Sequence, residues 1–122
     1  MDYNERTEFA IDCFLLAGRI MMESGAETYR VEDTMLRMAH SQGMTSAQSY
    51  VTPTGIIFSL GRTQPTRITS IPNRATNLHR ISLVNTISRK LTSSIITLEE
   101  AYDELKKIEK NNYMLPVFMQ II

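Results

Sequence analysis

Apolar residues recur at helical spacing in the first part of the chain. Between residues 4 and 23 they fall at i, i+4, i+7 and i+11, which predicts a helix through Phe9, Cys13, Leu16 and Ile20. Further apolar residues widen this surface, so we expect the helix to be buried on most sides. A second helix is predicted over residues 26–41, with one apolar stripe formed by Val31, Met35 and Met38.

The hydrophobic period changes after Gly43. Residues 46–52, 56–60 and 66–71 are short runs typical of strands. They are separated by a turn that contains Pro53 and Gly55 and by a hairpin connection over residues 61–65, and Pro72 ends the third run. Three consecutive short strands predict an antiparallel meander with one face covered by helices.

Two helices are predicted after the strands. The first begins near Asn77, and its inward positions are expected to be Leu78, Ile81, Val84, Ile87 and Leu91. The second begins at a Thr97-x-x-Glu100 capping box, and its core stripe is Leu98, Ala101, Leu105 and Ile108. The predicted order is α-α-β-β-β-α-α, an α+β domain with a small three-stranded antiparallel sheet packed against helices.

Polar residues concentrate at the junction of the first two helices, from Ser24 to Asp33. Ser24 and Glu27 have the spacing of a capping box. Residues three or four apart share a helix face, so Glu27 can reach Arg30, and Tyr29 can reach the acidic residues that follow. Two interpretations stay open: an ordinary helix start with a surface ion pair, or a polar binding site.

The last ten residues, 113–122, carry no charge and are almost entirely apolar. Ten residues are too few to span a bilayer. Because three lysines precede them, we expect residues 1–112 to form a soluble domain on the cytoplasmic side and residues 113–122 to begin a first transmembrane segment. The alternative is a C-terminal strand or helix that completes the core of the domain.

Formal net charge is zero, but the charges are unevenly placed. No Asp or Glu occurs between Thr34 and Leu98, and the flanking segments are acidic. This pattern indicates either complementarity within or between subunits or a surface that attracts anions. We expect no nucleic-acid partner, because basic and aromatic residues do not alternate.

Few of the common catalytic or metal-binding patterns occur. Neither His40 nor His79 has a second ligand at i+4, and the one cysteine, Cys13, lies in an apolar stripe. We therefore expect no metal, no cofactor and no disulfide. The spacing of the acidic residues does not require catalysis, so we expect no enzymatic activity.

Five segments of the chain resemble the N-terminal domain of the threonine/serine exporter (ThrE-like) family. They are Leu16–Thr34, Tyr50–Ile57, Thr66–Ile68, Asn77–Ile81 and Thr97–Ala101. The resemblance implies the soluble part of a bacterial cell-membrane exporter of small amino acids such as threonine and serine, or of small dicarboxylates. It also implies membrane spans after the domain and a partner, either a second copy or a second membrane subunit.

The resemblance also implies a set of site residues. The ligand-binding positions would be Glu27, Tyr29, Arg30, Glu32, Thr52, Thr54, Arg67 and Asn77, and the structural ones Gly25, Pro53 and Gly55. A zwitterionic amino acid needs both signs of charge, which the two arginines and the two glutamates supply. The domain would act in gating, substrate sensing or assembly. The alternatives are an oligomerisation module without a ligand, or a hydrolase-like domain that uses Glu27, Arg30 and Glu32.

Overall fold

The computed structural model describes residues 3–61 and 64–111 of the chain. Its elements are α1 (Tyr3–Glu23), α2 (Thr28–Ser41), β1 (Gln48–Thr52), β2 (Gly55–Ser59), β3 (Thr66–Ser70), α3 (Leu78–Thr92) and α4 (Leu98–Asn111). The strands form one antiparallel sheet in the order β1-β2-β3. The predicted α+β class and element order are confirmed.

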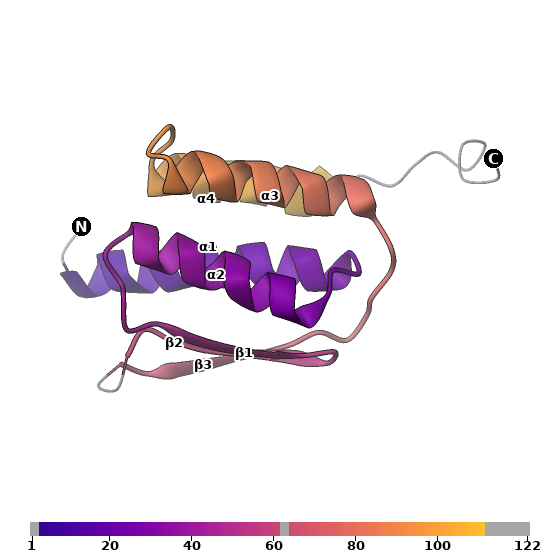
Figure 1. The fold of residues 1–122 in the computed structure, drawn as a ribbon, viewed down its shortest axis with the longest axis horizontal. Coiled ribbons are helices and arrows are strands. Elements are labelled where there is room, and N and C mark those ends of the chain that lie inside the picture. Colours follow the sequence, from indigo (N-terminus) through magenta and orange to yellow (C-terminus); the bar gives the residue numbers. More distant parts are fainter. Residues whose placement is uncertain (1–2, 62–63, 112–122) are drawn as a thin grey trace.

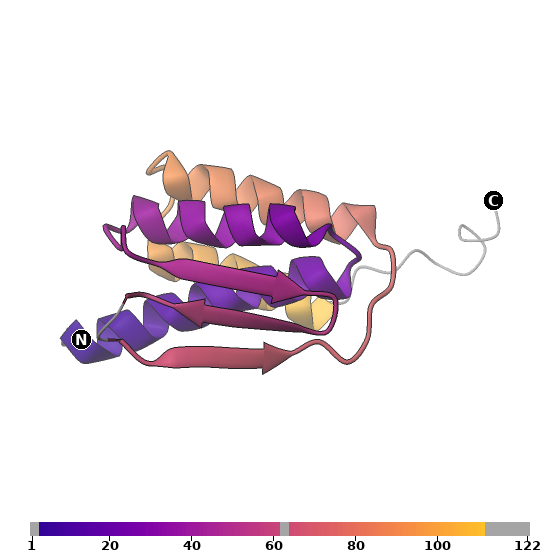
Figure 2. The same cartoon turned by 60° about the horizontal axis from the view of Figure 1, so that its bottom comes forward.

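The elements form three layers (Figure 1). The sheet is one outer layer, α1 and α2 lie against one of its faces, and α3 and α4 cover the other side of those two helices. Figure 2 shows the three strands side by side with no helix in front of them. The sheet therefore has one covered face and one open face.

Helix α1 is the central element of the core. It contacts α2, α3, α4 and β2, and residues along its whole length, such as Phe14 and Ile20, are completely buried. The ring of Phe14 meets that of Phe58 on β2 edge to face, with centroids 6.0 Å apart. The expected burial of this helix on most sides is confirmed.

Three helices end in the same backbone motif. After α1, the N–H of Ala26 bonds the carbonyl of Met21 and the N–H of Gly25 bonds that of Met22, which is the Schellman pattern with a left-handed residue at its centre. Gly25 has φ +91°. Gly43 (φ 83°) after α2 and Ser94 (φ 59°) after α3 are placed in the same way.

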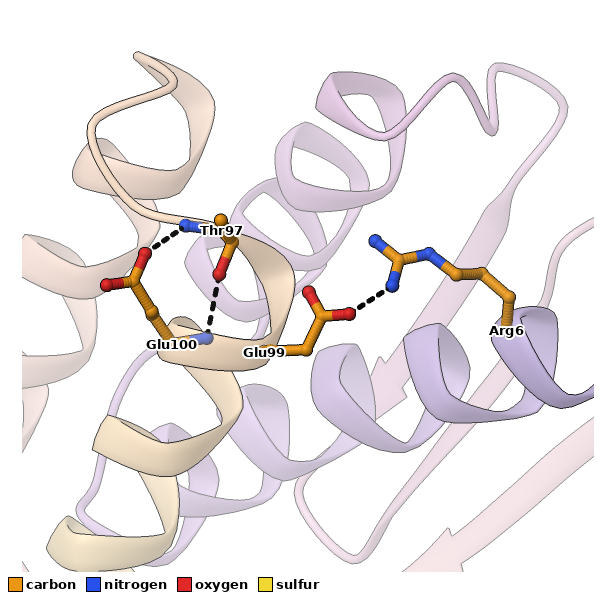
Figure 3. A network of polar contacts seen from close by, with 4 residues as sticks. All are labelled: Arg6, Thr97, Glu99 and Glu100. Carbon is orange, nitrogen blue, oxygen red and sulfur yellow. Dashed lines mark hydrogen bonds and ion pairs between the residues drawn. The ribbon is translucent and has the colours of Figure 1, made fainter. Parts of the chain in front are cut away.

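The predicted capping box of Ser24 and Glu27 is wrong. Because Ser24 closes α1, the N-cap of α2 is Glu27, in an extended conformation and without a side-chain cap. The second predicted box is confirmed: the N–H of Thr97 bonds Glu100 Oε1 at 2.9 Å, and the N–H of Glu100 bonds Thr97 Oγ1 at 3.1 Å. Figure 3 shows this box beside the ion pair of Arg6 and Glu99.

One predicted core position of α3 is also wrong. Leu78 is 73% exposed, whereas Arg80 is only 8% exposed. The inward stripe runs through Arg80, Val84, Ile87 and Leu91, so a charged residue takes the position that the apolar pattern assigned to a leucine.

Within residues 3–61 and 64–111, no helix is both long enough and apolar enough to cross a membrane. The predicted transmembrane start at residues 113–122 lies outside the described residues, and the boundary at residue 112 stays a prediction.

Candidate functional site

Three segments meet at one end of the fold, which we call the polar corner: residues 23–30, the β1–β2 turn (52–55) and the connection 71–77. Backbone bonds join them, because the N–H of Ala75 bonds the carbonyl of Glu23 and the N–H of Asn77 bonds that of Ser24, both at 2.9 Å. The N–H of Ile71 bonds the carbonyl of Thr54 at 2.8 Å. These bonds hold the end of α1, the turn and the start of α3 together.

Three predicted site residues lie on the exposed surface of this corner. Glu27, Tyr29 and Arg30 all face solvent, and Tyr29 is 60% exposed. A hydrogen bond to Tyr29 raises the pKa of Arg30, and the charge of Glu27 adds to the effect. A carboxylate, a phenol and a guanidinium therefore lie within one turn of helix. This set matches the two charges of an amino acid.

Glu32 has a structural partner. Its carboxylate accepts a 2.8 Å hydrogen bond from the N–H of Val51, and its backbone carbonyl accepts a 3.2 Å bond from the hydroxyl of Ser49. The carboxylate thus joins α2 to β1. The next acid, Asp33, pairs with Arg37 one turn further along α2.

The turn between β1 and β2 is held by its own threonine. Thr52 Oγ1 accepts a 3.3 Å bond from the N–H of Thr54 and donates a 3.4 Å bond to the carbonyl of Gly55. A Cβ at Gly55 would lie 3.2 Å from the carbonyl oxygen of Thr69 on β3. Pro53 is exposed at the tip. The hydroxyl of Thr54 is exposed and lies 3.5 Å from that of Thr52.

Arg67 lies away from the polar corner. It is on the covered face of β3, where its guanidinium bonds Glu8 at 2.7 Å and Asp12 at 2.8 Å on the first half of α1. The structure therefore does not bring the two predicted carboxylate-binding arginines together.

Asn77 lies in the polar corner and caps α3. Its side-chain oxygen accepts a 3.1 Å bond from the N–H of Arg80. This is the usual role of an asparagine at a helix start.

A cleft at the opposite end of the fold was missed by the sequence analysis. It has a volume of about 1040 Å³ and is lined by the α2–β1 connection, both sides of the β2–β3 connection, Arg6, Thr7 and Leu98. The guanidinium of Arg6 is engaged by Glu99. No sequence motif marks this cleft, because its walls come from connections that are distant in sequence.

Metal and thiol chemistry find little support in the described part of the chain. No group of three His, Cys, Asp or Glu side chains within residues 3–61 and 64–111 could hold a metal ion. Burial raises the pKa of the Cys13 thiol to about 12, with a smaller contribution from Asp12. A thiol in this environment stays protonated and unreactive at neutral pH.

Comparison with known proteins gives one match. The family model described as "ThrE: Putative threonine/serine exporter" matches residues 12–122. Searches of the curated proteins and of the solved structures returned no match. The matched range contains the polar corner and all the predicted site residues.

Proposed function

We propose, because this chain belongs to the threonine/serine exporter family, that it is the cytoplasmic domain of a membrane exporter of small amino acids or small dicarboxylates. In this proposal the domain binds the exported compound before transport and thereby gates the exporter. The membrane-spanning part would follow residue 112.

The observation that carries the proposal is the composition of the polar corner. Glu27 and Arg30 offer opposite charges on one exposed helix turn, with Tyr29 beside them. Neither charged side chain bonds an oppositely charged group at close range elsewhere among the described residues, unlike Asp33 and Arg37. Arg30 would bind the carboxylate of the ligand, and Glu27 would bind its ammonium group.

The position of the corner also supports the proposal. The C-terminal half of α4 lies against that of α1, where Glu109 pairs with Arg19. The corner, at the end of α1, is thus at the end of the domain where α4 finishes (Figure 2). A ligand bound there would lie at the same end of the domain as the last turn of α4.

Calorimetric titration with threonine, serine and succinate tests this function. We expect saturable heat with at least one of them, and Glu27→Gln and Arg30→Gln should each weaken binding by about tenfold or more, because a charge-assisted bond is lost. Arg37→Gln on the same helix is the matched control and should bind as the wild type does. Absence of heat for all three compounds removes the sensing role of this corner.

A second candidate function, assembly, rests on the open face of the sheet. Tyr50, Ile57 and Ile68 are direct cross-strand partners on that face and are 61%, 42% and 76% exposed. The other side chains that share this face are Gln48, Thr52, Ser59, Thr66 and Ser70, with Gly55 between them. None of these residues is charged. A two-fold contact places a face against itself, so an uncharged apolar stripe suits a second copy of this chain.

Light scattering across protein concentration and salt tests assembly. We expect a dimer whose mass does not change with salt, and Ile57→Lys should convert it to a monomer, because two lysines would then meet across the axis. Ile95→Lys is the control, because Ile95 is 69% exposed but lies far from the sheet, after α3. A monomer at every concentration rules this function out.

A further inference from the structure

The cleft at the end of the fold opposite the polar corner has room for a small organic molecule. Its volume is about 1040 Å³, and clefts that bind small molecules usually measure about 300–1,000 Å³. It is lined by the α2–β1 and β2–β3 connections and by residues from the starts of α1 and α4. No residue of the polar corner lines it, so a ligand bound here is separate from one bound at the corner.

The surface that the cleft offers is polar and mostly uncharged. Three of its apolar residues, Ala47, Leu60 and Leu98, are at most 8% exposed and present little area to a ligand. Around them lie the side-chain amides of Gln42, Gln48 and Gln64 and the exposed hydroxyls of Thr45, Ser46 and Thr66. Amides and hydroxyls both donate and accept hydrogen bonds. Such a surface suits a ligand that carries hydroxyl groups of its own.

Arg6 is the one charged side chain among the described residues that line the cleft. A guanidinium has five N–H donors. Within residues 3–61 and 64–111, Arg6 uses its Nη1 to bond Glu99 and has no other partner (Figure 3). The side chain of Arg6 is 43% exposed and that of Glu99 is 51% exposed. The remaining donors of Arg6 are therefore open to a further acceptor.

Arg67 shows that one arginine of this protein can hold two carboxylates. Its guanidinium bonds Glu8 at 2.7 Å and Asp12 at 2.8 Å. Arg6 holds a single carboxylate, and no acid lines the described part of the cleft. A second oxyanion on Arg6 would therefore come from a ligand.

Glu99 is stabilised by its own helix as well as by Arg6. It lies in the first turn of α4, where the helix dipole favours an acid. The bond from Arg6 lowers the pKa of Glu99, and a bond from the backbone N–H of Glu99 itself adds to the effect. Exposed ion pairs contribute little to stability. Arg6 can thus share its guanidinium with a ligand at little cost to the fold.

We propose that this cleft binds a hydroxylated small molecule that bears one oxyanion, which is the chemistry shared by sugar acids and sugar phosphates. The free N–H groups of Arg6 bind the oxyanion, because a guanidinium matches the geometry of a carboxylate or a phosphate. The glutamine amides and the exposed hydroxyls bind the hydroxyl groups of the ligand. The site includes neither Glu27 nor Arg30, so this inference stands apart from the proposed function.

Calorimetric titration with four compounds tests both parts of this recognition. D-Gluconate and glucose 6-phosphate each combine a hydroxylated body with one oxyanion. Sorbitol keeps the hydroxylated body without the charge, and acetate keeps the carboxylate without the body. We expect gluconate or glucose 6-phosphate to bind at least about tenfold more tightly than sorbitol and acetate, because each control compound lacks one set of bonds. The tighter of the two ligands shows whether the oxyanion is a carboxylate or a phosphate.

Two substitutions in the same ion pair separate recognition from structure. Arg6→Gln should weaken binding by about tenfold or more, because the charge-assisted bonds to the oxyanion are lost. Glu99→Gln is the matched control: it breaks the same pair but keeps Arg6, so binding should be unchanged or tighter. The pair is exposed on both sides, so both variants should fold. Equal weakening in the two variants would mean that the pair only shapes the cleft.

NMR spectra of the side-chain amides locate the bound ligand. The signals of Gln42, Gln48 and Gln64 should shift with saturation as the ligand is added. The signal of Asn73, which is exposed in the connection 71–77, should not move. The inference is overturned if neither gluconate nor glucose 6-phosphate binds, if sorbitol or acetate binds as tightly as they do, or if Arg6→Gln and Glu99→Gln weaken binding equally.

Discussion

The side-chain carboxylate of Glu32 on α2 accepts a 2.8 Å hydrogen bond from the backbone N–H of Val51 on β1. The N–H of Val51 thus has a side chain as its acceptor, and β1 is bonded directly to α2, against which it lies. A residue that the family resemblance placed in a ligand site thus also joins the sheet to the helices.

Replacing Glu32 by Ala should lower the free energy of unfolding by about 1–3 kcal/mol, because the N–H of the buried Val51 loses a charged acceptor. Urea denaturation measures the change. Asp33→Ala is the matched control: the Asp33–Arg37 pair is exposed on both sides, so its loss should cost less than about 0.5 kcal/mol. Equal losses for the two variants would contradict the anchoring role of Glu32.

The guanidinium of Arg67 separates two acids that are one turn apart on α1. Arg67→Met leaves Glu8 and Asp12 facing each other at i and i+4, where like charges repel. We expect a loss of roughly 1 kcal/mol at low ionic strength and a smaller loss in about 0.5 M salt, because all three side chains are partly exposed.

The same cluster allows a reversal of sign to be tested. Asp12→Asn should destabilise the wild type, because it removes an ion pair, but it should stabilise Arg67→Met, because it removes the repulsion. Urea denaturation of the four proteins gives the coupling energy. Additive effects of the two substitutions would mean that Arg67 does not hold the acids together.

Local structure could be predicted correctly from the sequence wherever the interactions that decide it lie within a few residues of each other. The Thr97–Glu100 box forms as predicted because its two bonds lie within one helix turn. Ser24 and Glu27 have the same spacing but form no capping box. Ser24 belongs to the C-terminal end of α1, and its carbonyl is bonded by the connection 71–77, about fifty residues later in the chain.

The candidate site was predictable only in part, for the same reason. Glu27, Tyr29 and Arg30 are neighbours in sequence and remain neighbours in space. Arg67 is drawn to Glu8 and Asp12 by the way β3 crosses α1, which no local pattern reveals. The burial of Arg80 was not predicted, because a search for apolar periodicity counts only apolar residues and passes over an arginine at an inward position of α3.

Cys13 should be inert in the folded protein. Its pKa is raised from the ordinary value near 9 to about 12, so at pH 8 a thiol-specific reagent should react only at the rate of unfolding. Between these two pKa values the Cys13 thiol is deprotonated in the unfolded chain but still protonated in the folded protein. The free energy of unfolding should therefore fall as the pH rises above about 9. Rapid stoichiometric labelling of the native protein at pH 8 would contradict this assignment.

The three helix ends with left-handed residues allow the cost of that conformation to be separated from the cost of crowding. Gly25 and Gly43 have similar φ values, but a Cβ at Gly25 would lie 3.3 Å from the Cα of Thr76, whereas nothing lies within 4 Å of one at Gly43. Gly43→Ala should therefore cost about 1 kcal/mol for the conformation alone. Gly25→Ala should cost roughly 2 kcal/mol, because the connection to α3 must also move.

Ser94 carries the same conformation with a side chain, at φ 59°, so replacing it should act in the opposite direction. Ser94→Gly removes the strain and increases the freedom of the unfolded chain, and we expect a net gain of about 0.5 kcal/mol. Urea denaturation of the three variants gives all the values under one condition. Equal losses of stability in the two glycine variants would mean that crowding at Thr76 has no effect. If Ser94→Gly destabilises the protein, the left-handed strain at Ser94 costs less free energy than the extra freedom that glycine gives the unfolded chain.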